Sequence, residues 1–180
     1  AAMVAVVPAS LPVNDLKGFI DYAKANPVHY ASAGVGSFGH LSTEAFASKA
    51  GLRMTHVPYK GQAPTTTAAV AGEVQLLITT PSGAMNDFIA QRRLKLLAVT
   101  SPEPSPLAPG APTIGQTLPG YAAESWFAIV GPAGMPEIQE KFKSFGVTAR
   151  TATPQRLAQM TADEVKRWQP VIRDNNIKAE

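Results

Sequence analysis

The sequence lacks cysteine altogether, in a chain of 180 residues. Without cysteine there can be no disulfide framework, no thiolate nucleophile and no cysteine-ligated metal site, so the composition leaves the cellular compartment open. Charged residues are also few, at 16%, against 45% hydrophobic residues, which is the balance of a globular protein. No apolar run approaches the roughly 20 residues that a membrane-spanning helix needs.

Histidine and strong charge are scarce as well. The three histidines, at positions 29, 40 and 56, do not stand at metal-ligand spacing from carboxylates, so we expect no metal site. The net charge of +3 comes from scattered lysines and arginines, which does not favour a nucleic-acid partner and suits a small anionic ligand equally well. Residues 1–7 are typical of a strand and not of a signal peptide.

What the chain does have is a glycine-rich stretch, YASAGVGSFGH, over residues 30–40. It stands where an apolar run typical of a buried strand gives way to apolar residues at helical spacing. Gly34, Gly36 and Gly39 allow the backbone to come close to another group, and Ser37 is placed to cap the helix. Free N–H groups and the positive end of a helix dipole would then meet at one point, which favours an anion.

Other interpretations of this stretch stand beside the anion site. The glycines can serve only to make a tight bend. Their spacing also matches a dinucleotide fingerprint, but the acidic residue expected about 20 positions later is replaced by HVPYK at 56–60, so a nucleotide is disfavoured. Ser37 and His40 could form part of a hydrolase site, yet Val35 stands where a nucleophile elbow needs glycine.

Strands alternating with helices over residues 1–100 predict a parallel sheet with helices on both faces. The predicted strands cover residues 3–7, 29–33, 54–57, 74–79 and 94–99. Four helices are predicted between these strands. The first is capped by Asn14 and the second ends at Gly51. The third has Pro64 at its first position, and the fourth follows Ser82. Ligands of such sheets bind beyond the carboxyl ends of the strands, so we expect loops 33–37, 59–61 and 80–82 to converge on one cavity.

The last 80 residues follow a less regular pattern. Residues 101–121 are rich in proline and glycine and predict a long surface connection. Strands are expected at 123–130 and 147–151, and a final helix begins at Thr153-Pro154. Its apolar face is predicted to contain Leu157, Val165, Trp168 and Ile172.

Several sequence blocks together resemble the Bug family, the extracytoplasmic solute-binding receptors of tripartite tricarboxylate transporters. These blocks are YASAGxGSxxH at 30–40, HVPYKG at 56–61, LLAVTS at 96–101, APTI at 111–114, LPGY at 118–121, SWF at 125–127 and GPAG at 131–134. They occur in the family's order over nearly the whole chain, and HVPYKG is the most specific of them.

The resemblance implies an α/β, periplasmic-binding-protein-like (type II) fold with parallel sheets, in which two lobes close on a small organic acid. It implies a periplasmic monomer that passes its ligand to membrane permease subunits, with no catalysis and no cofactor. Residues 1–100 would form ligand-binding lobe 2, and residues 101–180 the crossover and the C-terminal part of lobe 1. The family's first strand and its proline- and glycine-rich loop have no counterpart before Ala1, so we expect lobe 1 to be incomplete in this chain. The junctions at 26–28 and 135–137 are also short against the family pattern.

Matched onto this sequence, the family's ligand loops give ten candidate binding residues. They are Gly36, Ser37, Phe38, Gly39, His40, Tyr59, Lys60, Thr80, Pro81 and Ser82. Many relatives carry Asp or Asn near Thr79, so an amino group on the ligand is less expected here. Two other functions stay open, a serine hydrolase that uses Ser37 and His40, and an effector-sensing or protein-docking module of the same lobe architecture.

Overall fold

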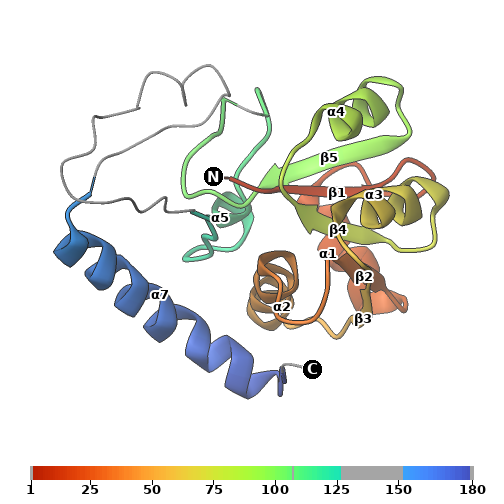
Figure 1. The fold of residues 1–180 in the computed structure, drawn as a ribbon. Coiled ribbons are helices and arrows are strands. Elements are labelled where there is room, and N and C mark those ends of the chain that lie inside the picture. Colours follow the sequence, from red (N-terminus) through yellow and green to blue (C-terminus); the bar gives the residue numbers. More distant parts are fainter. Residues whose placement is uncertain (1, 107, 127–151, 179–180) are drawn as a thin grey trace.

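The computed structural model describes residues 2–106, 108–126 and 152–178. Within these residues the centre of the fold is a five-stranded sheet in the order β3-β2-β4-β1-β5 (Figure 1). The strands are β1 (Val4–Pro8), β2 (His29–Ser32), β3 (Thr55–Pro58), β4 (Leu76–Thr79) and β5 (Leu94–Val99). Each lies within or close to its predicted range, because short apolar runs between turn signals are typical of buried strands.

The direction of β1 differs from the prediction. β2 pairs in parallel with β3 and β4, but β1 runs antiparallel to both of its neighbours, β4 and β5. The prediction of an entirely parallel sheet is therefore wrong for β1. All five residues of this strand are buried, with Val4 and Val6 on one face and Ala5 and Val7 on the other. A strand that is covered on both faces has the same apolar pattern in either direction, so its sequence does not indicate which way it runs.

Helices cover both faces of the sheet, as predicted (Figure 1). They are α1 (Leu16–Ala25), α2 (Phe38–Ala50), α3 (Gln62–Ala71), α4 (Gly83–Ala90), α5 (Ile114–Thr117) and α7 (Pro154–Asp174). On one face, α1 and α2 bury Phe19 and Phe46 in a core that α5 also joins. On the other face, α3 and α4 bury Ala69 and Met85 against the sheet.

Local capping residues set most helix boundaries where the sequence predicts them. The hydroxyls of Ser37, Ser82 and Thr153 each accept a hydrogen bond from a backbone N–H of the helix they precede. Gly51 and Gly72 end α2 and α3 in the left-handed conformation, with φ of 65° and 79°. That conformation costs glycine nothing, because it has no Cβ.

Two predicted boundaries need correction. Asp15, and not Asn14, caps α1, because its Oδ1 accepts a 2.6 Å hydrogen bond from the N–H of Gly18. Both residue types are good caps, so only the position of the first helical turn decides between them. Helix α3 begins at Gln62, which places Pro64 third in the helix and not first. Proline is still tolerated there, since the N–H groups of the first turn have no partner within the helix.

The prediction of a surface connection for residues 101–121 is confirmed only in part, because most of the described residues there are exposed but several are buried. Ile114 is fully buried in the short helix α5, and Tyr121 is 5% exposed. The Tyr121 hydroxyl donates a 3.0 Å hydrogen bond to the carbonyl of Ser42 in α2. Proline and glycine interrupt regular structure but do not prevent burial, so a segment with few repeating elements still packs against the core.

Residues just beyond the sheet are joined by backbone hydrogen bonds. The N–H of Thr100 donates to the carbonyl of Met3, and its carbonyl accepts from the N–H of Ala123. The Thr100 side chain adds to these, because its Oγ1 accepts from the N–H of Met3. Glu124 forms an isolated bridge with Ala2, which is all that the described residues show of the strand predicted at 123–130. The rest of that strand, and the one at 147–151, lie outside the described residues. The division of the chain into lobes at residue 100 stays a prediction.

Helix α7 begins where predicted and packs against α2 (Figure 1). Trp168 is 8% exposed, and its ring meets Phe38 of α2 edge-on with 5.2 Å between the centroids. Val165 and Ile172, however, are 58% and 38% exposed, so the predicted apolar face is only partly packed against the described residues. No helix in the described part of the chain is long and apolar enough to cross a membrane.

Candidate functional site

The three predicted ligand loops meet at one edge of the sheet. Because β2, β3 and β4 are parallel, the loops that follow them all lie at their carboxyl ends. The N–H of Tyr59 donates a 2.9 Å hydrogen bond to the carbonyl of Ser32, which ties the second loop to the end of β2. The side-chain amide of Gln62 donates a 2.5 Å hydrogen bond to the carbonyl of Thr80, which ties the second loop to the third.

The first loop turns sharply into α2. Gly34 and Gly36 have φ of 130° and 73°, values that only glycine adopts readily. The N–H of Ser37 donates to the carbonyl of Gly34 at 3.2 Å, and the Ser37 hydroxyl accepts from the N–H of His40 at 3.3 Å. Because Phe38 and Gly39 lie in the first turn of α2, their backbone N–H groups have no partner within the helix.

Gly39 is required by close packing and not by its backbone angles. A Cβ at this position would lie 2.8 Å from the carbonyl oxygen of Ile78 in β4. The first turn of α2 is therefore pressed directly against the backbone of β4. The Phe38 side chain packs against Trp168, so only its backbone N–H is a candidate ligand contact.

His40 is buried beneath the first loop. It is 5% exposed, and its Nδ1 accepts a 3.0 Å hydrogen bond from the N–H of Gly36. Its ring stacks on the ring of His56, with 3.8 Å between the centroids and 14° between the planes. Burial lowers the pKa of His40, an effect that the nearby Glu44 carboxylate partly offsets. Burial, and secondarily the charge of His40, lowers the pKa of His56 to about 4.

Sequence reasoning missed the partners of His40. The ring of Tyr30 stacks on His56, with 5.0 Å between the centroids, and also lies 6.2 Å from the ring of His40; its hydroxyl donates to Glu44. The Ser32 hydroxyl lies 2.6 Å from Nε2 of His56. The register of β2 and β3 places Tyr30 opposite His56, so correct pairing of these two strands would have identified the first of these contacts.

The second and third loops also lead into helices. Gly61 precedes α3 with φ of 99° and provides no side-chain cap, and Lys60 beside it is exposed. The Tyr59 hydroxyl donates to a carboxylate oxygen of Glu73 at a long 3.4 Å, and the pKa of Tyr59 is raised by partial desolvation and by that carboxylate. Ser82 caps α4 by accepting from the N–H of Met85 at 3.3 Å. The amino ends of α2, α3 and α4 therefore all lie at this edge.

The structure does not pair Ser37 with His40 as a nucleophile and its base. The contact between them joins the Ser37 hydroxyl to the backbone N–H of His40. The Nδ1 atom of His40 already accepts from Gly36, and its ring lies against His56. Among the described residues, no group of three His, Asp or Glu side chains could hold a metal ion.

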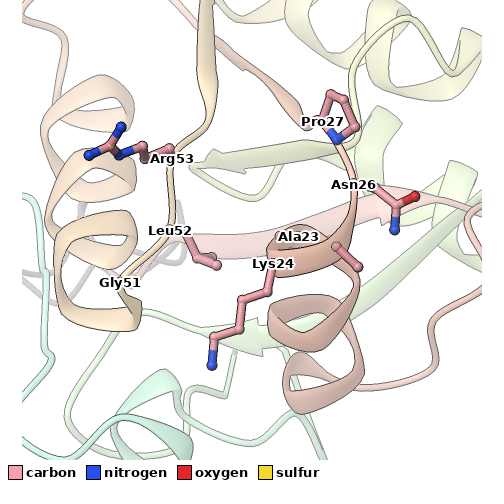
Figure 2. A pocket seen from close by; sticks show the side chains of 8 residues that line it. Ala23, Lys24, Asn26, Pro27, Gly51, Leu52 and Arg53 are labelled. Atoms are coloured by element: carbon pink, nitrogen blue, oxygen red, sulfur yellow. The ribbon is translucent and has the colours of Figure 1, made fainter.

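A hollow of about 420 Å³ lies elsewhere, at the amino ends of β2 and β3 (Figure 2). Its walls are the end of α1 with the short junction 26–28, and the turn from α2 to β3. Lys24 and Arg53 line it, but in Figure 2 their charged ends point in different directions. The hollow is thus at the opposite edge of the sheet from the three loops.

The family model for the tripartite tricarboxylate transporter family receptor matches residues 1–144. This chain belongs to that receptor family. The result confirms the family predicted from the sequence blocks, and the family's receptors are extracytoplasmic.

Individual proteins similar to this chain include one curated relative and two solved structures. Protein BugT of Bordetella pertussis is 30% identical over 98% of this chain. An R. palustris protein solved with adipate is 30% identical, with a TM-score of 0.82 over 98% of this chain and 66% of its own. MatC from Rhodopseudomonas palustris, solved with bound malate, is 22% identical with a TM-score of 0.74 over 95% of this chain and 66% of its own, and supports the fold alone. The periplasmic-binding-protein class predicted from the sequence is thereby confirmed.

The receptor chain is shorter than these proteins. It spans about 60% of the length of BugT and 66% of the adipate-bound chain. The matched part includes all three candidate ligand loops. About two fifths of BugT and one third of the adipate-bound chain lie outside the match.

Proposed function

We propose that this chain is the ligand-binding part of a periplasmic receptor that captures a small organic carboxylate for a tripartite tricarboxylate transporter and performs no catalysis. The observation that carries the proposal is the meeting of three helix amino ends, those of α2, α3 and α4, at one edge of the sheet. Each brings first-turn N–H groups and the positive end of a helix dipole, which together favour an anion.

The candidate binding residues supply neutral donors and one cation. The Ser37 oxygen accepts from His40, which leaves the hydroxyl hydrogen for a carboxylate oxygen. The N–H groups of Phe38 and Gly39 point from the same turn, and exposed Lys60 adds a positive charge. These donors suit an oxyanion, and they provide no nucleophile with a base beside it.

The comparisons support the same ligand class. The R. palustris relative at 30% identity was solved with adipate, a dicarboxylate. We propose that the present receptor also binds a carboxylate. We do not specify its chain length, because backbone N–H donors recognise the charge and shape of a carboxylate group and not the number of methylene groups attached to it. We also propose that the receptor is a monomer that delivers its ligand to the transporter's permease subunits.

The test is calorimetric titration of the native protein that contains this chain with adipate, malate and benzoate, followed by thermal shift at saturating ligand. We expect saturable binding of at least one carboxylate, a melting temperature that rises with its concentration by mass action, and no chemical change of the ligand. Absence of any shift across the panel, or turnover of the ligand, would contradict the proposal.

A pair of capping variants separates binding from stability. Ser37→Ala and Thr153→Ala each remove a helix-capping hydroxyl, and each should lower stability by about 0.5 to 2 kcal/mol. Only Ser37→Ala should also weaken carboxylate binding, by about 1.5 to 3 kcal/mol, which is the value of a hydrogen bond to a charged group. Equal affinities for the two variants would remove Ser37 from the site.

A further inference from the structure

The loop that begins the candidate site is held at two points by buried side chains. At Gly36, the backbone N–H donates to Nδ1 of His40 at 3.0 Å. At Gly34, the N–H donates to the Ser32 hydroxyl at 3.2 Å, and the carbonyl accepts from the same hydroxyl at 2.9 Å. The Ser32 oxygen in turn lies 2.6 Å from Nε2 of His56.

The contact with Gly36 fixes the hydrogen position on the His40 ring. A ring nitrogen that accepts from Gly36 carries no hydrogen, so neutral His40 must carry its hydrogen on Nε2. The single Ser32 hydrogen goes either to the Gly34 carbonyl, with Nε2 of His56 donating to the Ser32 oxygen, or to Nε2 of His56, so this contact assigns no tautomer to His56. His40 therefore has a defined tautomer.

Contacts among three aromatic rings support this arrangement. Tyr30, His40 and His56 form a cluster in which every pair of rings is in contact, with centroid separations of 5.0 Å (Tyr30–His56), 3.8 Å (His40–His56) and 6.2 Å (Tyr30–His40). The groups that face the two rings are Tyr30 and Ser32 from β2 and Glu44 from α2, and the Tyr30 hydroxyl already donates to the Glu44 carboxylate. A proton on Nδ1 of His40 would remove the acceptor for Gly36, and a charge on either ring would face the other ring.

We propose that His40 and His56 are positioning residues, which set the conformation of loop 34–37 and thereby the affinity for the carboxylate without touching it. The loop needs such support because both of its glycines have positive φ, so their backbone angles alone select no single conformation. This inference rests on the proposed function for the ligand. Its central geometric claim, the acceptor role of His40, does not depend on any ligand.

The first experiment needs no ligand. Long-range ¹H–¹⁵N correlation spectra of the ¹⁵N-labelled chain at pH 7 report which ring nitrogen of each histidine carries hydrogen. We expect His40 as the Nε2–H tautomer, with its Nδ1 shifted as a hydrogen-bond acceptor. A hydrogen on Nδ1 of His40 would overturn the proposal, whether or not any carboxylate binds.

The second experiment measures adipate affinity in variants of the native protein. Asparagine places an acceptor oxygen close to the position of Nδ1, so His40→Asn should bind adipate within about threefold of the unmodified protein, while His40→Leu should lose about tenfold. His29→Asn is the matched control, since His29 is exposed on the same sheet, and its affinity should not change. In amide ¹H–¹⁵N spectra, the signal of the Gly36 N–H should shift strongly only in His40→Leu.

The outcomes separate the two proposals. Unchanged adipate affinity in folded His40→Leu, or equal losses in His40→Leu and His40→Asn, would overturn the positioning role. If His40→Leu does not fold, the tautomer of His40 in the unmodified chain and the affinity of His40→Asn decide. If the unmodified protein binds no carboxylate, the proposed function fails, and the tautomer of His40 alone decides whether His40 holds the loop.

Discussion

Replacement of Gly39 by alanine should destabilise the protein, although alanine is normally the better helix residue. The added methyl group would lie 2.8 Å from the carbonyl oxygen of Ile78, where ordinary contacts begin at 3.4 Å. Both partners belong to the backbone of packed elements, α2 and β4, so neither can rotate away. Relief requires a relative movement of about half an ångström between the helix and the sheet.

The magnitude follows from two opposing effects. Overpacking of this kind costs about 1 to 3 kcal/mol. Replacement of glycine by alanine also reduces the conformational entropy of the unfolded chain, which stabilises the folded state by about 0.4 to 1 kcal/mol. The free energy of unfolding should therefore fall by about 1 to 2 kcal/mol.

Urea denaturation followed by circular dichroism measures the change. For an m-value near 2 kcal/mol/M, the midpoint should fall by roughly 0.5 to 1 M. Gly83→Ala is the matched control, because Gly83 also lies in the first turn of a helix but its added methyl group would meet nothing within 4 Å. That variant should be as stable as the unmodified protein or slightly more stable.

The reasoning would be refuted if Gly39→Ala were as stable as Gly83→Ala. The helix and the strand would then have enough freedom to separate, and the close packing of α2 on β4 would not constrain the candidate site. If Gly39→Ala loses stability as expected, the displaced first turn of α2 should also weaken carboxylate binding.

Two further predictions concern stability. Folding lowers the pKa of His56 to about 4 and also lowers that of His40. Below about pH 6.5 the unfolded chain therefore binds more protons than the folded chain. The free energy of unfolding should decrease as the pH drops from 6.5 towards 4. We expect a loss of about 1 to 2 kcal/mol, discounted because the His56 ring is partly exposed, and urea midpoints that show no decrease over this range would contradict it. Trp168→Ala should cost about 3 kcal/mol because it removes a buried ring, whereas Val165→Ala, at a 58% exposed position of the same helix, should change stability by less than about 0.5 kcal/mol in the same assay. Similar losses for the two would mean that α7 packs through a different face.

The sequence by itself determined the local structure and the family. Apolar periodicity predicted the strands and the helices on both faces, and capping residues such as Ser37 and Gly51 predicted where helices begin and end. These features depend on residues within one or two turns of each other, so they can be read from neighbouring positions. The same is true of the glycine-rich loop and the HVPYKG block that marked the receptor family.

Only the tertiary structure decided which segments meet. The direction of β1 leaves no trace in its uniformly apolar sequence, and the burial of Tyr121 depends on the distant α2. The stack of His40 on His56 joins residues 16 positions apart, through the pairing of β2 with β3 and the packing of α2 on the sheet. Such contacts depend on long-range packing, for which a single sequence carries no local signal, and they convert a histidine of the ligand motif into a buried support for the loop.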